Sequence, residues 1–151
     1  PLSLLNVLFY PHIELSSPTY ELVLGFFILI WTNDTFAYLT GMLFGRHKFF
    51  ERISPKKTWE GTIGGAVFAI IGAYILSLVF QVINPIEWIG FVLTLIIFGT
   101  FGDLIESMFK RTINVKDSGG LMPGHGGILD RLDSILIAAP FVIIYVVFVI
   151  N

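Results

Sequence analysis

The sequence contains no cysteine, which excludes disulfide bonds and metal sites with cysteine ligands. Charged residues are also scarce: they form 13% of the 151 residues, against about 25% in a typical soluble protein. Hydrophobic residues form 55%, and the mean hydropathy is +0.83. A soluble domain of this size needs more polar surface than these residues supply, whereas a surface that faces lipid does not. The composition therefore predicts a membrane protein.

Common catalytic motifs are absent from the sequence as well. It has no Gly-x-x-x-x-Gly-Lys-Ser/Thr phosphate loop, no Gly-x-Ser-x-Gly nucleophile motif and no His-Glu-x-x-His helix. The three histidines are scattered and there is no cysteine, so a zinc site is not expected. Any chemistry must therefore come from residues grouped in another pattern.

Apolar stretches dominate the sequence and approach the length of about 20 residues that a membrane-spanning helix needs. The predicted spans are residues 21–44, 62–83, 88–109 and 129–150. Pro140 lies within the last span and predicts a kink there. We expect an all-α fold, a polytopic transmembrane helical bundle of about four spans, in which residues 1–151 form a single catalytic domain.

The first predicted span is interrupted by polar residues, namely Thr32, Asn33, Asp34 and Thr35. Two structures fit this pattern. One has two short helices with a break between them. The other is a single span in which Asp34 faces the protein interior, because a charge at that depth rarely faces lipid. In the second structure Asn33 and Thr35 could help to solvate the carboxylate.

Positive charge gathers in two windows, since all nine Lys and Arg lie within residues 46–57 and 110–131. Four spans place both windows on one side of the membrane. The opposite side then receives residues 84–87 and both ends of the chain, which contain no Lys or Arg. The positive-inside rule therefore places both basic loops in the cytoplasm.

The first basic loop ends in a dense polar run, residues 54–61. Ser54 followed by Pro55 is typical of a helix start, with an N-cap and then Pro at the first helical position. Such a start aims backbone amides at an anion, and the ammonium groups of Lys56 and Lys57 suit phosphate. Phosphate binding and an ordinary solvated loop are both consistent with this run.

The second basic window is flanked by acidic helix ends. At helical spacing Asp103, Glu106 and Lys110 share one face, and Asp130 and Asp133 share a face of the next helix. Residues 103–133 hold five acidic residues, four basic residues and one histidine. Salt bridges at the helix ends could account for a single acid, whereas the mixture of oxygen ligands and cations suits a magnesium-bridged polyphosphate.

Glycine is frequent between these helix ends, with five glycines from Gly119 to Gly127. It allows phosphate oxygens to reach backbone amides without a Cβ in the way. His125 lies among these glycines, where it either hydrogen-bonds within the loop or contacts a phosphate or a transferred proton. The sequence therefore predicts a metal-dependent phosphate site at one membrane surface.

The stretch from Ser107 to Asp133 reads Ser-x-apolar-Lys-Arg, four residues, Lys-Asp-x-Gly, and then Pro-x-His-Gly-Gly-apolar-x-Asp-Arg-apolar-Asp. This pattern resembles the signature of the phosphatidate cytidylyltransferase (CDP-diacylglycerol synthase) family. Residues 34–41 and 54–61 resemble the upstream motifs of that family. Met122 stands where the family is expected to have Ile, Leu or Phe. The resemblance covers about residues 30–135 and implies the C-terminal catalytic portion of a longer chain.

The resemblance implies transfer of CMP from CTP to phosphatidate, giving CDP-diacylglycerol and pyrophosphate for phospholipid synthesis. It implies magnesium as cofactor, as one ion or as a pair, in an integral protein of a bacterial cytoplasmic membrane with its site facing the cytoplasm. The expected catalytic residues are Asp103, Lys110, Arg111, Lys116, Asp117, His125, Asp130 and Arg131. The expected substrate-binding residues are Ser54, Lys56, Lys57, Thr58, Glu60, Gly126 and Gly127. The expected metal ligands are Asp103 and Asp130, with Glu106 and Asp133 as further candidates.

Two other functions fit the same residues. A CTP-dependent polyprenol or lipid kinase would use similar cations and metal, but would need a base for a neutral hydroxyl. An ion-coupled transporter would use Asp34 and Asp103 as ligands within the membrane. The expected partners are CTP, phosphatidate and the lipid bilayer, with no nucleic acid, and the sequence leaves a homodimer open.

Overall fold

The computed structural model describes residues 20–50, 54–112 and 129–149, with only the backbone described at residues 50, 54–56 and 129–133. These residues form four helices and one two-stranded sheet. The elements are α2 (Tyr20–Phe44), β1 (Lys48–Phe50), β2 (Ser54–Thr58), α3 (Trp59–Val79), α4 (Pro85–Thr112) and α5 (Leu129–Val149). Their order and length confirm the predicted all-α bundle, with a small hairpin added.

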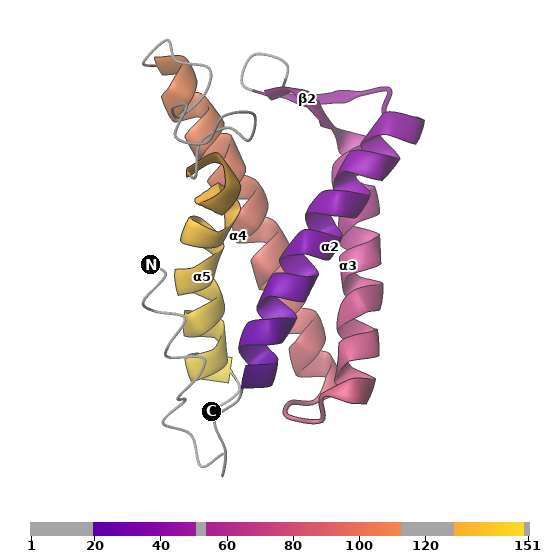
Figure 1. Cartoon of the computed structure of the whole chain (residues 1–151), viewed down its shortest axis with the longest axis vertical. Helices are drawn as coiled ribbons and strands as arrows, with labels where there is room; N and C mark the ends of the chain where they lie inside the picture. Colours follow the sequence, from indigo (N-terminus) through magenta and orange to yellow (C-terminus); the bar gives the residue numbers. More distant parts are fainter. Residues whose placement is uncertain (1–19, 51–53, 113–128, 150–151) are drawn as a thin grey trace.

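Three of the helices, α2, α3 and α4, are long and apolar enough to cross a membrane. The fourth predicted span corresponds to α5, whose stretch Ser134–Val149 is a shorter apolar helix. Figure 1 shows that the helices run alternately up and down, so that the hairpin, the end of α4 and the start of α5 lie toward the same end of the bundle. The described flanks of both basic windows therefore lie toward one end of the bundle, as parity predicts. We call it the hairpin end.

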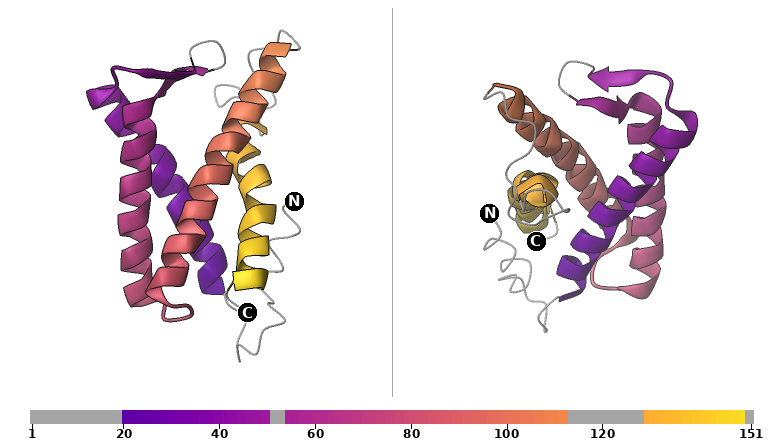
Figure 2. Two further views of the ribbon diagram at one scale, coloured as in Figure 1. Left: turned by 180° about the vertical axis from the view of Figure 1, so that it is seen from behind. Right: turned by 45° about the horizontal axis from the view of Figure 1, so that its top comes forward.

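The helices pack as two antiparallel pairs, α2 with α3 and α4 with α5, and α3 contacts α4 beside the turn that joins them. At the end opposite the hairpin, all four helices meet in one apolar core. Its fully buried members include Phe26, Trp88, Phe91, Leu95 and Val142. The two pairs separate toward the hairpin end, where α4 moves away from α3 (Figure 2).

Helix α2 is continuous through its polar centre, which settles the choice between a single span and two short helices. Thr32 Oγ1 donates a hydrogen bond to the Ile28 carbonyl oxygen at 2.7 Å, and Thr40 Oγ1 donates to the Phe36 carbonyl at 2.6 Å. These bonds satisfy the hydroxyls inside their own helix, so the polar residues need no break.

Glycines bring α2 and α3 unusually close beside this polar segment. A Cβ added at Gly61 would lie 2.7 Å from the Ala37 carbonyl oxygen, and one at Gly65 would lie 2.6 Å from the Asn33 carbonyl oxygen. Both distances are too short for a side chain. The two backbones therefore approach each other only because these positions lack a Cβ.

The predicted helix start at Ser54 and Pro55 is wrong. Residues 54–58 form β2, which pairs antiparallel with β1 in the register Lys48 to Thr58. Pro55 is tolerated there because a two-stranded sheet has only edge strands. The N-cap of α3 is Thr58, whose Oγ1 accepts a hydrogen bond from the Gly61 N–H at 3.1 Å.

The turn between α3 and α4 also differs from the prediction. Helix α3 ends at Val79 rather than at residue 83, and α4 begins at Pro85 rather than at Trp88. The Glu87 carboxylate accepts a hydrogen bond from the Asn84 N–H at 2.7 Å. This contact, in which the third helical residue accepts the N–H of the residue before the helix, and Pro at the first helical position place the boundary three residues earlier than apolarity alone indicated.

Candidate functional site

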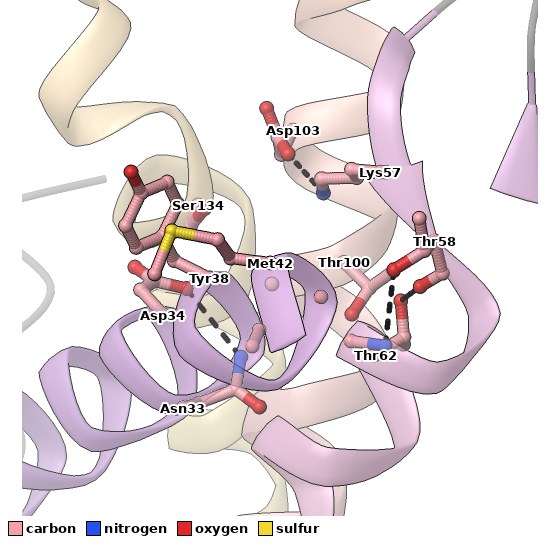
Figure 3. Close-up of a pocket in the computed structure, with 14 residues that line it drawn as sticks. Asn33, Asp34, Tyr38, Met42, Lys57, Thr58, Thr62, Thr100, Asp103 and Ser134 are labelled. Carbon is pink, nitrogen blue, oxygen red and sulfur yellow. Dashed lines mark hydrogen bonds and ion pairs between the residues drawn. The ribbon is translucent and has the colours of Figure 1, made fainter. Parts of the chain in front are cut away.

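A cavity of about 630 Å³ opens between the two helix pairs at the hairpin end. Residues from α2, β2, α3, α4 and α5 line it (Figure 3). The polar lining residues are Asn33, Asp34, Tyr38, Lys57, Thr58, Thr62, Thr100, Asp103 and Ser134. The cavity therefore gathers polar groups from both sides of the predicted site within a mostly apolar chain.

The first basic window meets the acidic end of α4, which flanks the second window, at an ion pair. Lys57 Nζ on β2 contacts Asp103 Oδ2 on α4. Both side chains are partly exposed, at 29% and 28%, so both are accessible from the cavity. Lys57 was predicted to bind substrate and Asp103 to bind metal from separate parts of the sequence. The structure places them in direct contact (Figure 3).

Asp34 supplies a second carboxylate to the cavity. Asn33 Nδ2 donates a hydrogen bond to Asp34 Oδ1 at 3.4 Å, so the neighbour expected to solvate this carboxylate does so. Asp34 also lies within electrostatic range of both Lys57 and Asp103. The cavity thus has two carboxylates and one ammonium group, contributed by three different elements.

Hydroxyl groups surround these charges. Thr58 caps α3, and Thr62 Oγ1 donates to the Thr58 carbonyl oxygen at 3.1 Å. Thr100 on α4 and Ser134 on α5 line the cavity as well. Hydroxyls can donate hydrogen bonds to phosphate oxygens. A ligand rich in phosphate would therefore meet both donors and a cation here.

Glu106 and Lys110 confirm the predicted shared face of α4. Lys110 Nζ lies 2.9 Å from Glu106 Oε1, as an ion pair one helical turn apart. Neither Glu106 oxygen accepts a hydrogen bond with adequate geometry from the described residues. Within this part of the chain, Glu106 is therefore engaged as a helix salt bridge, the alternative that its sequence spacing allowed.

Several predicted site residues are not tested by the structure. Lys116, Asp117, His125, Gly126 and Gly127 lie outside the described residues. The backbone alone is described for Ser54 and Lys56 in β2 and for Asp130, Arg131 and Asp133 in α5. Ser134 follows directly and lines the cavity, which places the start of α5 beside it. The convergence of Asp103 with Asp130 stays a prediction.

Besides Glu106 and Lys110, two further predicted site residues with described side chains lie outside the cavity lining. Arg111 is exposed near the end of α4. Glu60 turns toward His47 and contacts its ring and backbone. By contrast, Tyr38, Met42, Thr62 and Thr100 line the cavity but were not predicted. Two of them could have been found from the sequence. Tyr38 and Met42 follow Asp34 at intervals of four residues and so share its helical face.

The described residues were also tested as a metal site. They contain no group of three acidic or histidine side chains that could hold an ion by protein ligands alone. Magnesium sites commonly use one or two carboxylates and leave the remaining positions to water and substrate phosphates. The carboxylates of Asp34 and Asp103 fit such an open magnesium site. The described residues do not fit a closed site, in which the protein alone supplies the ligands.

Comparison with known proteins gives a consistent result. The sequence model of the cytidylyltransferase family matches residues 3–149. The phosphatidate cytidylyltransferase of Staphylococcus saprophyticus is 43% identical over 129 residues, which are 84% of this chain and 49% of that protein. The phosphatidate cytidylyltransferase of Bacillus subtilis is 49% identical over 117 residues, which are 76% of this chain and 43% of that protein. The chain thus spans about half the length of the curated relatives it matches, and it belongs to the cytidylyltransferase family.

Proposed function

We propose that this chain provides the phosphate-binding part of a phosphatidate cytidylyltransferase, which transfers CMP from CTP to phosphatidate and releases pyrophosphate. The observation that carries the proposal is the Lys57–Asp103 pair in a cavity also lined by Asp34. A cation and two carboxylates from distant segments suit a metal-bound triphosphate. The names of the relatives supply the reaction.

The reaction needs positioning more than a base. A phosphate oxygen of phosphatidate is already anionic, so it can attack the α-phosphorus of CTP without losing a proton. The bond from that phosphorus to the bridging oxygen of the β-phosphate breaks, and pyrophosphate leaves. Preorganised charge and alignment supply most of the catalysis in such a displacement.

The charged side chains of the cavity and a neighbouring hydroxyl each have a role in this scheme. Lys57 neutralises the triphosphate, and the hydroxyl of Thr58, whose oxygen accepts the Gly61 N–H, donates to one of its oxygens. Asp103 and Asp34 would hold magnesium, with Asp130 as the further predicted ligand. Magnesium, when bound, neutralises charge that develops on the leaving pyrophosphate. Lys57 then exchanges its contact with Asp103 for a phosphate oxygen.

The cavity lies where a lipid and a water-soluble nucleotide can meet. Tyr38 and Met42 on the α2 side of the cavity are exposed and lie on a helix able to cross the membrane. The described parts of both basic windows lie at the hairpin end. We therefore propose that this end faces the cytoplasm of a bacterial cell, since membrane loops rich in Lys and Arg stay inside.

The test uses the full-length protein in liposomes with phosphatidate, magnesium and CTP labelled at either the α- or the γ-phosphorus. Lipid extraction should recover the α-label in lipid and the γ-label in water-soluble pyrophosphate. Recovery of the γ-label in lipid would instead establish a lipid kinase. Movement of an ion across the liposome membrane, with neither label in lipid, would establish a transporter.

A further inference from the structure

Glu60 makes a set of contacts that its predicted role in substrate binding does not explain. Both of its carboxylate oxygens accept the His47 backbone N–H at 3.2 Å. His47 Nδ1 lies 2.6 Å from Glu60 Oε1. One carboxylate thus holds the backbone and the ring of the same residue. Glu60 does not line the described cavity, so its oxygens are engaged away from the site where phosphate is proposed to bind.

His47 is held from its other side as well. Its carbonyl oxygen accepts the Trp59 N–H at 3.0 Å. The next residue of β1, Lys48, pairs with Thr58 of β2. The Phe49 and Trp59 rings meet edge to face, with centroids 4.3 Å apart. The residue before β1 and the first residues of β1 are therefore fixed to the start of α3 through backbone, carboxylate and aromatic contacts.

These contacts determine where the hairpin lies. Lys57 directly precedes Thr58, which both pairs with Lys48 and caps α3. A hairpin that shifted along or away from α3 would carry Lys57 with it. The hairpin has only two strands, and isolated two-stranded sheets are only marginally stable. Its position must therefore come from contacts such as those of Glu60.

We propose that Glu60 is a positioning residue, which clamps His47 so that the β1–β2 hairpin holds Lys57 against Asp103 across the cavity. The kinetic consequence of this clamp rests on the proposed function, whereas its geometric consequence does not. Glu60 differs in this respect from a substrate ligand, because its effect passes through Lys57.

The first experiment measures geometry without activity. Residues 1–151 contain no cysteine, so Lys57→Cys with Asp103→Cys introduces the only two thiols of this part of the protein, and any cysteine elsewhere in the full-length protein is replaced by serine. A short bis-maleimide should crosslink these thiols in the membrane-embedded full-length protein. Adding Glu60→Ala should lower the crosslinked fraction about fivefold, in keeping with the loss of a partly exposed charged contact.

Glu87→Ala is the matched control. Glu87 is also a first-turn glutamate that accepts a preceding backbone N–H, from Asn84, but it lies at the opposite end of the bundle. It should leave the crosslinked fraction unchanged. Equal crosslinking in the Glu60→Ala and Glu87→Ala proteins would overturn the proposal, even if the protein transfers CMP as proposed.

The second experiment is a double-mutant cycle on CMP transfer. Glu60→Ala should lower kcat/KM for CTP about tenfold when Lys57 is present, and less than about twofold in a Lys57→Ala protein, because residues that act through one another are not additive. If Glu60→Ala causes the same fold-loss with and without Lys57, then Glu60 acts independently of Lys57, and the clamp is refuted. Glu60→Gln, which keeps one acceptor oxygen for the His47 N–H, should recover part of the loss and serves as the test variant if Glu60→Ala does not fold.

Discussion

The two ends of the bundle are built from the same helices but are packed in opposite ways. At the end with Trp88, large side chains from α2, α4 and α5 are fully buried against one another, and α3 adds the small buried side chains of Ala69 and Ala73. At the hairpin end the helix pairs separate around a cavity lined by Asp34, Lys57 and Asp103. The comparison indicates that one end stabilises the fold while the other leaves charged groups accessible.

Because the two ends differ in this way, we expect substitutions to affect activity and stability separately. Substitutions at the cavity should change activity with little effect on unfolding. Substitutions in the apolar core should change stability with little effect on the turnover of the folded fraction. The predictions below test that separation on named residues.

The largest effect is expected from Asp103→Asn, which keeps the shape of the side chain but removes its charge. CMP transfer should fall by at least about 10³-fold, because the proposed metal ligand and the partner of Lys57 are both lost. The measurement is the initial rate with α-labelled CTP in liposomes. Thermal unfolding in detergent should be unchanged. Turnover at the wild-type rate would remove Asp103 from the metal site.

Trp88→Ala tests the other end of the bundle. Trp88 is fully buried, and its ring packs against Phe91 with centroids 5.5 Å apart. Truncation should destabilise the protein by about 3–5 kcal/mol through lost contacts and a cavity. Thermal unfolding in detergent measures the change. The exposed Ile86, in the same helix turn, provides the control Ile86→Ala. An unchanged melting temperature for Trp88→Ala would contradict the view that this end of the bundle stabilises the fold.

Lys57→Met should lower kcat/KM for CTP about 10²-fold, because the triphosphate of CTP loses a preorganised cation. Lys48→Met is the matched control, since Lys48 lies on the paired strand of the same hairpin but does not line the described cavity. It should change kcat/KM less than about threefold. Equal losses in the two proteins would mean that the hairpin acts through its overall charge alone.

The smallest effect is expected from Asp34→Asn. Asp34 supports the cavity from α2 and lies farther along the chain from the predicted signature than Asp103 does. We expect about a tenfold loss in kcat, within the range found when a supporting ligand is removed. Titration of activity with magnesium should show a higher requirement for the ion. A complete loss of activity would mean that Asp34 is as important for catalysis as Asp103.

Charge patterning made much of the topology predictable. The two basic windows and the apolar stretches placed the hairpin end on one side, because parity and the cost of burying charge leave few alternatives. Asp103 was predicted as a site residue from its helical spacing to Glu106 and Lys110, and Lys57 from its place in the polar run 54–61. Their direct contact was not predictable, since it depends on tertiary packing between β2 and α4.

The features that the sequence analysis missed are local, and at each of them the sequence fits more than one structure. Ser54-Pro55 and Thr58-Trp59 both offer a hydroxyl residue that could cap a helix, and only the pairing with β1 selects Thr58. The core residue Trp88 looked like a span start because the Asn84–Glu87 contact is hard to recognise beside an apolar run. Thr62 and Thr100 were missed since single hydroxyls inside spans usually bond to their own helix.

The most direct test of the account asks whether the cavity binds the nucleotide. Met42 lines the cavity but has no assigned chemical role, so Met42→Cys places a single thiol there. Magnesium and CTP should slow its labelling by a maleimide about tenfold, because a bound ligand blocks access in proportion to occupancy. Labelling of an Ile86→Cys protein should not change. Equal labelling of the position 42 thiol with and without CTP, at concentrations that support turnover, would contradict the central claim.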